Sequence, residues 1–161
     1  VCGKASIEMV QTTSCFLLAK GSPIITTTAL GQLPAQLRKQ QAVFAQTGGI
    51  HAVGLFNSAG ELLLHAEDVG RHNALDKLIG QALKSRRFPL SDGIVLVSGR
   101  ASFELTQKAI MAGIPVLAAV GAPSSLAIEL AEEHGMTVIG FLKPHRFNIY
   151  CGSERVRLQT N

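Results

Sequence analysis

The spacing of apolar residues alternates between helical and extended periods along the chain. Residues 71–87 carry an apolar stripe with the spacing of an amphipathic helix: Leu75, Leu78, Ile79, Ala82 and Leu83. An apolar run over 62–64 precedes this stretch, and the run over 94–97 that follows it is apolar throughout. Short, fully apolar runs are typical of strands covered on both faces, so 94–97 is predicted to be a central strand.

The same alternation continues towards the C-terminus. It predicts two helices and two strands: 101–112, 115–120, 124–134 and 137–142. Gly113 and Gly135 follow the two helical stretches, as expected for residues that end helices.

The pattern before residue 66 predicts a helix and a hairpin. The helix covers about 33–46, with Pro34 at its front, and the hairpin strands cover 50–56 and 61–65. The first thirty residues favour a helical turn and two extended stretches: 5–10, 15–19 and 26–28. Strands that alternate with helices of this length predict an α/β fold. We expect a three-layer α/β/α sandwich around a mixed, mostly parallel sheet of about five strands.

Composition favours one soluble domain. The chain has 161 residues, of which 47% are hydrophobic, and this is enough for a sizeable core. It contains neither a run of about 18 apolar residues nor a signal-peptide pattern, so we expect a cytoplasmic protein without membrane contact. Three scattered cysteines disfavour a disulfide framework. The net charge of +4 and one short basic run, Lys84 to Arg87, do not indicate nucleic-acid binding.

Polar residues gather after the four strands of the predicted sheet that point the same way. The segments there read "AEDVGRHN", "SGRASFE", "GAPSS" and "KPHRFN", whereas the opposite turns carry scattered charge. In an open α/β sheet, ligands bind outside the carboxyl ends of the strands. The asymmetry therefore predicts a binding crevice built from these four loops.

The side chains of the crevice suit a phosphate or pyrophosphate. Its cations are Arg71, Arg100, Lys143 and Arg146. Its hydroxyl groups come from Ser98, Ser102, Ser124 and Ser125. Gly70, Gly99 and Gly121 permit close approach of the backbone, and helix N-termini offer unpaired N–H groups. Glu67 and Asp68 either pair with Arg71 or Arg100, or accept hydrogen bonds from a base or a ribose.

Simpler interpretations exist for several of these residues. Ser102 and Ser124 fit helix N-caps, and Glu67 with Arg71 fits a structural ion pair. His72 fits a polar residue at a helix start, and His51 fits a buried histidine. The dinucleotide, P-loop and nucleophile-elbow motifs are absent from the sequence. A Rossmann dehydrogenase, a P-loop kinase and an α/β-hydrolase are therefore disfavoured.

Six long motifs resemble the FdhD family of accessory sulfurtransferases for formate dehydrogenase. They are "CGKAS", "GGIHAVGLF", "EDVGRHNALDKLIG", "SGRASFELTQKA", "PVLAAVGAPSSLAIELA" and "GFLKPHRFNIY". The resemblance implies a cytidine-deaminase-like domain over 31–150, preceded by a remnant of an N-terminal segment over 1–30 and followed by a tail over 151–161. The deaminase zinc motifs are missing at "GRHNA" and "SGRASFE", so we expect no zinc and no deamination.

The resemblance also implies a cargo and partners. It implies that the protein takes sulfur from a cysteine desulfurase and passes it to molybdenum bis(molybdopterin guanine dinucleotide), which formate dehydrogenase then receives. GDP would mimic that cofactor, and a homodimer is expected. The binding segment of the family falls on Phe141, Leu142, Lys143, Pro144, His145 and Arg146. Further expected contacts are Arg71, His72, Ser98, Arg100 and Ser124. The alternative function is a non-catalytic chaperone that binds the cofactor.

Cys2 is the candidate for the sulfur-carrying residue. The family pattern C-x-x-C-G-K is matched here only in its second half, by "CGK", so we expect a fragment that lacks the first cysteine. A lowered pKa would help Cys2, because the thiolate is the nucleophile. The other interpretation is a passive thiol. Cys15 is expected in the core, and Cys151 is expected to have no role.

Overall fold

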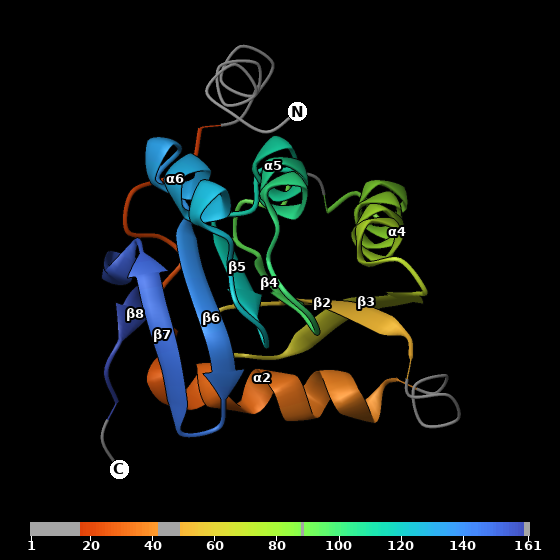
Figure 1. Ribbon diagram of the computed structural model, residues 1–161, viewed down its shortest axis with the longest axis horizontal. Coiled ribbons are helices and arrows are strands. Elements are labelled where there is room, and N and C mark those ends of the chain that lie inside the picture. Colours follow the sequence, from red (N-terminus) through yellow and green to blue (C-terminus); the bar gives the residue numbers. More distant parts are fainter. Residues whose placement is uncertain (1–16, 42–48, 88, 160–161) are drawn as a thin grey trace.

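The protein is built around one six-stranded sheet. The computed structural model describes residues 17–41, 49–87 and 89–159. The strand order is β3-β2-β4-β5-β6-β7 (Figure 1). The strands are β2 (His51–Phe56), β3 (Leu62–Asp68), β4 (Ile94–Val97), β5 (Val116–Ala119), β6 (Thr137–Lys143) and β7 (Arg146–Cys151). A second, two-stranded sheet pairs β1 (Ile25–Thr26) with β8 (Val156–Arg157), which follows the short 3-10 helix η1 (Ser153–Arg155).

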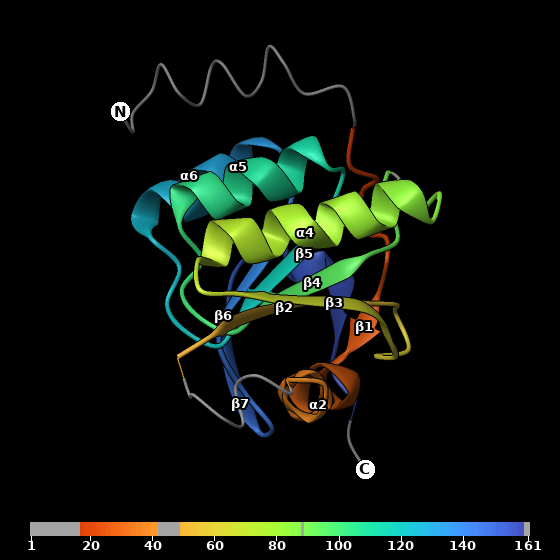
Figure 2. The same ribbon diagram turned by 90° about the vertical axis from the view of Figure 1, so that its right-hand side faces the viewer.

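Helices cover both faces of the main sheet. On one face lie α4 (Arg71–Lys84), α5 (Phe103–Met111) and α6 (Ser125–Glu133), and on the other lies α2 (Thr27–Lys39), as Figure 2 shows. The predicted three-layer, mixed α/β architecture is thus confirmed. None of the helices in the described ranges is long and apolar enough to cross a membrane.

Each face of the sheet has its own apolar core. Leucines of α4 and α5, including Leu75, Leu78 and Leu105, are fully buried on one side. Leu30 and Leu33 of α2 are fully buried on the other side. Burying one such side chain stabilises a protein by roughly 1.5–3 kcal/mol. The two cores hold the strand ends in fixed positions, and the candidate site depends on those positions.

Strand directions bring four loops to one edge. β2 runs antiparallel to both β3 and β4, while β4, β5 and β6 run parallel to one another. As a result β3, β4, β5 and β6 all end at the same edge of the sheet. We call this edge, formed by residues 67–72, 98–102, 120–124 and 141–146, the carboxyl edge. Its existence was predicted from the element order and is confirmed.

The predicted N-terminal helix was misplaced. We expected it over 33–46, but α2 begins at Thr27 and ends at Lys39. Thr26 is its N-cap, whose hydroxyl accepts a hydrogen bond from the backbone N–H of Ala29 at 3.1 Å. Pro34 lies inside the helix rather than at its front. The threonine-rich stretch that favoured a strand over 26–28 therefore contains a strand end and the first helical turn.

The main sheet has six strands rather than about five. The additional strand, β7, returns antiparallel to β6, and an irregularity interrupts their pairing between Gly140 and Lys143. The segment "KPHRFN" is predicted to be a loop, but Arg146 already begins β7. A strand is predicted over 15–19, but its described residues, 17–19, form no regular element. The helical turn predicted over 5–10 lies outside the described residues.

Candidate functional site

Three of the four predicted loops line one cavity at the carboxyl edge. The cavity has a volume of about 300 Å³. Its lining residues are Arg71, Arg100, Ala101, Ser102, Ala122, Pro123 and Ser124. Arg71 comes from the start of α4, while the other residues come from the loops after β4 and β5. The structure therefore brings together three predicted contact residues, Arg71, Arg100 and Ser124.

Backbone hydrogen bonds hold the loops after β4 and β5 against each other. Gly121 donates to the carbonyl oxygen of Gly99 at 2.9 Å, and Ser124 donates to that of Ala101 at 3.0 Å. A Cβ atom at Gly121 would lie 3.0 Å from Cγ of Arg100 and 3.1 Å from the oxygen of Gly99. Glycine at this position lets the stem of Arg100 lie close to the neighbouring loop. These contacts fix the two loops relative to each other at the stem of Arg100.

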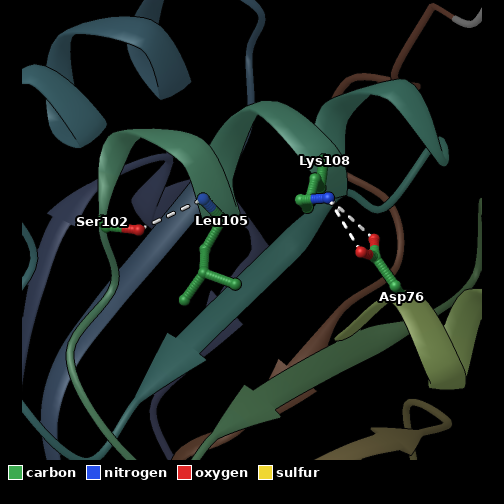
Figure 3. A network of polar contacts seen from close by, with 4 residues as sticks. All are labelled: Asp76, Ser102, Leu105 and Lys108. Atoms are coloured by element: carbon green, nitrogen blue, oxygen red, sulfur yellow. Dashed lines mark hydrogen bonds and ion pairs between the residues drawn. The ribbon is translucent and has the colours of Figure 1, made fainter. Parts of the chain in front are cut away.

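The three helices that begin at this edge differ in their N-caps. Ser102 and Ser124 cap α5 and α6, accepting hydrogen bonds from Leu105 at 3.2 Å and Ala127 at 3.1 Å (Figure 3 shows Ser102). The simpler interpretation of these serines is confirmed, although each hydroxyl hydrogen can still be donated to a ligand. The N-cap of α4 is Gly70, which has no side chain for capping. First-turn amides of α4 therefore remain available to an anion.

Asp68 does not pair with either arginine of the cavity. Its Oδ2 lies 2.7 Å from Nζ of Lys77, and its Oδ1 accepts a hydrogen bond from Gly70 at 3.0 Å. The hydrogen bond from Lys77, followed by that from Gly70, lowers the pKa of Asp68. Asp68 thus orders the turn into α4 and leaves Arg71 without a neutralising partner.

The ion pair between Glu67 and Arg71, which is one interpretation of these two residues, does not form either. Oε2 of Glu67 and Nε of Arg71 are buried and have no hydrogen-bond partner within the described part of the chain. Lys77–Asp68 and Lys108–Asp76 do form ion pairs, the second shown in Figure 3. Arg71 and Arg100 have no such partner among the residues described. The cavity therefore carries unneutralised positive charge.

The segment 141–146 lies beside this cavity rather than inside it. The backbone N–H of Phe141 donates to the oxygen of Gly121 at 3.0 Å, which joins β6 to the cavity loop. Phe141 has a positive φ of 52°, and its side chain is 43% exposed. Together with Lys143, Arg146 and Asn148 it lines a separate hollow of about 360 Å³. The expectation that Arg146 shares one cavity with Arg71 is therefore wrong.

The tip of the β6–β7 hairpin packs on α2. A Cβ atom at Gly31 would lie 2.2 Å from the carbonyl oxygen of Pro144, so only glycine permits this approach. A third hollow, of about 710 Å³, lies here between Thr27, Thr28 and the tip residues, which include His145 and Arg146. Leu142 is buried in the core on the α2 side, so its side chain packs and cannot contact a ligand.

The remaining predicted residues have varied surroundings. Oγ of Ser98 accepts a hydrogen bond from the backbone N–H of Ala52 at 2.9 Å, so it joins β4 to β2. His72 is half-buried in the first turn of α4, and His51 is half-buried beside Gly99. Cys2 and Cys15 lie outside the described residues. Over the described ranges, no group of three or more His, Cys, Asp and Glu residues could hold a metal ion.

Cys151 belongs to the fold. It ends β7, is half-buried, and its thiol donates to the oxygen of Met136 at 3.3 Å. Burial raises the pKa of Cys151 to about 11. A thiol with this pKa is almost entirely protonated at neutral pH, so it is a poor nucleophile.

Sequence reasoning missed the β6–β7 hairpin and the contact that α2 makes with it. Alternation of Phe147 and Ile149 with Asn148 is the strand signal that would have revealed β7. The approach of Gly31 to Pro144 joins residues more than a hundred positions apart, and no local pattern encodes it.

Comparisons with known proteins place these features in context. Residues 1–157 match the FdhD/NarQ family. The chain is 56% identical over 160 residues, 99% of its length, to a protein named sulfur carrier protein FdhD from Streptomyces coelicolor, of which it covers 57%. It is 43% identical over 158 residues, 98% of its length, to the protein of the same name from Sulfolobus acidocaldarius, of which it covers 60%. The chain thus spans little more than half the length of these curated relatives.

A solved structure shares the fold. It is a crystal structure of a candidate formate dehydrogenase accessory protein from Desulfotalea psychrophila. The TM-score is 0.81 with 29% sequence identity, and the match covers 93% of this chain and 62% of the other.

Proposed function

The chain belongs to the FdhD/NarQ family, and from this premise we propose that its carboxyl edge binds a guanine-dinucleotide molybdenum cofactor as cargo. The observation that carries the proposal is the unneutralised charge of Arg71 and Arg100 in one cavity beside the uncapped start of α4. Guanidinium groups bind phosphate oxygens in pairs of parallel hydrogen bonds, and helix N-termini favour the same anion. A pyrophosphate supplies oxygens for the guanidinium groups and for the helix N-terminus.

The hollow next to the cavity suits the rest of such a ligand. Phe141 offers an exposed aromatic face there, and Lys143 and Arg146 offer two further cations. Because the Phe141 backbone is bonded to the cavity loop, the two binding surfaces are adjacent. Molybdenum bis(molybdopterin guanine dinucleotide) carries ring systems as well as pyrophosphates, so it can use both surfaces. GDP contains the guanosine and the diphosphate of this cofactor, so it is a small ligand with which binding to the cavity can be tested.

Sulfur transfer is the second half of the proposal. The thiolate of Cys2 attacks the terminal sulfur of a persulfide on a cysteine desulfurase, a new S–S bond forms on Cys2, and the desulfurase cysteine leaves as a thiolate. The raised pKa of Cys151 argues against that residue as the carrier. The proposed destination of the loaded cofactor is formate dehydrogenase, and the proposed assembly is a homodimer.

A non-catalytic chaperone is the alternative. It is favoured by the composition of the cavity, whose lining residues bind anions but include no cysteine. Alanine in place of Cys2, the cysteine of the "CGK" motif, separates the two functions. Retained activation of formate dehydrogenase would favour the chaperone, and lost activation with normal cofactor binding would favour sulfur transfer.

Calorimetric titration with GDP tests the binding proposal. The chain is expected to bind GDP, and Arg100→Ala is expected to weaken binding by about tenfold or more, because hydrogen bonds to charged groups contribute about 1.5–3 kcal/mol. Arg87→Ala is the matched control, since Arg87 is also exposed but lies at the opposite end of α4. Folded protein that binds no guanine nucleotide would contradict the proposal.

A further inference from the structure

One hydrogen-bonded network holds the start of α4 against the end of β3. Oδ1 of Asp68, the last residue of β3, accepts a hydrogen bond from the backbone N–H of Gly70 at 3.0 Å. Nζ of Lys77, further along α4, lies 2.7 Å from Oδ2 of Asp68 and donates to the backbone oxygen of Glu67 at 3.0 Å. The Asp68 side chain is only 16% exposed, so its bonds are better shielded from water than those of a surface ion pair.

This network takes the place of the side-chain cap that the neighbouring helices have. Ser102 and Ser124 cap α5 and α6, and each hydroxyl group occupies one amide of the first helical turn. In α4 the N-cap is Gly70, and Asp68 bonds the N–H of Gly70 itself, outside the helix. The start of α4 is thus held in place while the amides of its first turn stay available.

The same turn determines where Arg71 lies. Two residues separate Asp68 from Arg71, which begins α4 and lines the cavity at the carboxyl edge. Within the described ranges Arg71 forms no ion pair that could hold its guanidinium group. The position of that group therefore depends on where α4 begins, and the bond from Gly70 to Asp68 fixes this point.

The charge of Asp68 and its hydrogen bond affect anion binding in opposite directions. A carboxylate close to the cavity repels a phosphate, so removal of the charge alone raises phosphate affinity. Loss of the hydrogen bond releases the start of α4 and lowers phosphate affinity. The two effects can be told apart, because asparagine removes the charge and keeps an oxygen acceptor, whereas alanine removes both.

We propose that Asp68 is a positioning residue for the cavity at the carboxyl edge, acting through the backbone of Gly70 on the placement of Arg71. This inference rests on the proposed function. The hydrogen bond to Gly70 holds the guanidinium group of Arg71 and the first-turn amides of α4 in the arrangement that a diphosphate requires. Such preorganisation raises affinity, because less of the site has to be ordered when the ligand binds.

Calorimetric titration with GDP compares wild type with two variants of Asp68. Asp68→Ala is expected to bind GDP about tenfold more weakly, although it removes a negative charge. Asp68→Asn is expected to bind GDP within about threefold of wild type, because its side-chain oxygen still accepts from Gly70. The matched control is Asp76→Ala, which removes an exposed carboxylate of the same helix, paired with Lys108 at 2.8 Å (Figure 3), and should leave GDP affinity unchanged.

Asp68→Glu is a milder variant that keeps the test decisive even where Asp68→Ala does not fold. It retains the charge, but its longer side chain does not close the short turn that an aspartate makes with the N–H two residues on. GDP binding is expected to weaken about fivefold, whereas an effect of charge alone predicts no change.

A double-mutant cycle shows whether Asp68 acts through Arg71. If it does, the effect of Asp68→Ala on GDP affinity should shrink from about tenfold to about threefold or less when Arg71 is already alanine. A role in stability alone would lower the free energy of unfolding and leave the GDP affinity of the folded protein unchanged in both backgrounds.

Three results would overturn the inference. They are GDP binding by folded Asp68→Ala or Asp68→Glu that is unchanged or tighter, an equal loss in Asp68→Ala and Asp68→Asn, and full additivity with Arg71→Ala. In each case wild type still binds GDP. A wild type that binds no GDP refutes the proposed function itself, which is a distinguishable failure.

Discussion

Two arginines at opposite edges of the sheet have contrasting surroundings. Arg155 is 1% exposed and donates to four oxygens, those of Ala19, Ser22, Gly135 and the Thr137 hydroxyl. Arg71 is half-buried and has no hydrogen-bond partner for its buried Nε within the described ranges. Arg155 ties the segment before β1 to the start of β6, so its bonding capacity is used by the fold. The hydrogen-bonding capacity of Arg71 is left for a ligand.

This comparison shows how a structural cation differs from a binding cation. Burial alone does not separate them, since both side chains are removed from water in part. The number of protein acceptors around each guanidinium group separates the two kinds of arginine. A folded protein rarely leaves a buried donor without an acceptor unless a ligand supplies one.

Loss of Arg155 is expected to have the largest effect. Arg155→Ala leaves four oxygens without their donor, and each buried unsatisfied group costs about 1–3 kcal/mol. We expect the free energy of unfolding, measured by chemical denaturation, to fall by about 3 kcal/mol or more. Arg157→Ala, at an exposed position of β8, is the control. A loss of less than about 1 kcal/mol would show that Arg155 is not a structural anchor.

Gly31→Ala is expected to have the next largest effect. Its new methyl group would lie 2.2 Å from the Pro144 oxygen, so α2 and the hairpin have to separate, at a cost of about 1–3 kcal/mol. Faster amide hydrogen exchange over 141–147 would report the displaced hairpin. Gly80→Ala in α4 is the matched control, because a Cβ atom there meets no atom within 4 Å and alanine favours the helix. Equal behaviour of the two variants would refute the close packing.

Cys151 is expected to make stability depend on alkaline pH. Its pKa is about 11 in the folded protein against an ordinary value of 9.0. The thiol of the unfolded chain therefore loses its proton first, and stability falls as the pH rises from about 9 towards 11. Denaturation curves of wild type and Cys151→Ser should converge or cross over this range. Parallel pH profiles would mean that the thiol is not buried as described.

Arg71→Ala is expected to have the smallest effect on stability. Arg71 makes no ion pair within the described residues, so the free energy of unfolding should change by no more than about 0.5 kcal/mol. GDP affinity should nevertheless fall about tenfold. A large loss of stability would place Arg71 with Arg155 as a structural residue and weaken the comparison.

The carboxyl edge was predictable from sequence because it depends only on element order. Apolar runs such as Ile94–Val97 fix the strands, and the alternation with helices fixes their directions, so Arg71, Arg100 and Ser124 had to meet. The caps at Ser102 and Ser124 also followed from local rules. These features depend on short-range patterns that tertiary packing did not override.

Other features depend on contacts that no local pattern encodes. The choice of Lys77 as the partner of Asp68 depends on how α4 lies against β3. Arg146 lies outside the cavity that Arg71 lines because it belongs to β7, whose hairpin with β6 extends towards α2. Pro34 led to the wrong helix start because a proline in the middle of the helix was taken for one in its first turn.

A crystal structure of the chain with GDP tests the central claim most directly. The account predicts the diphosphate in the cavity at the start of α4, with its oxygens within hydrogen-bond distance of the Arg71 and Arg100 guanidinium groups. GDP bound elsewhere, with both arginines still unpartnered, would contradict it.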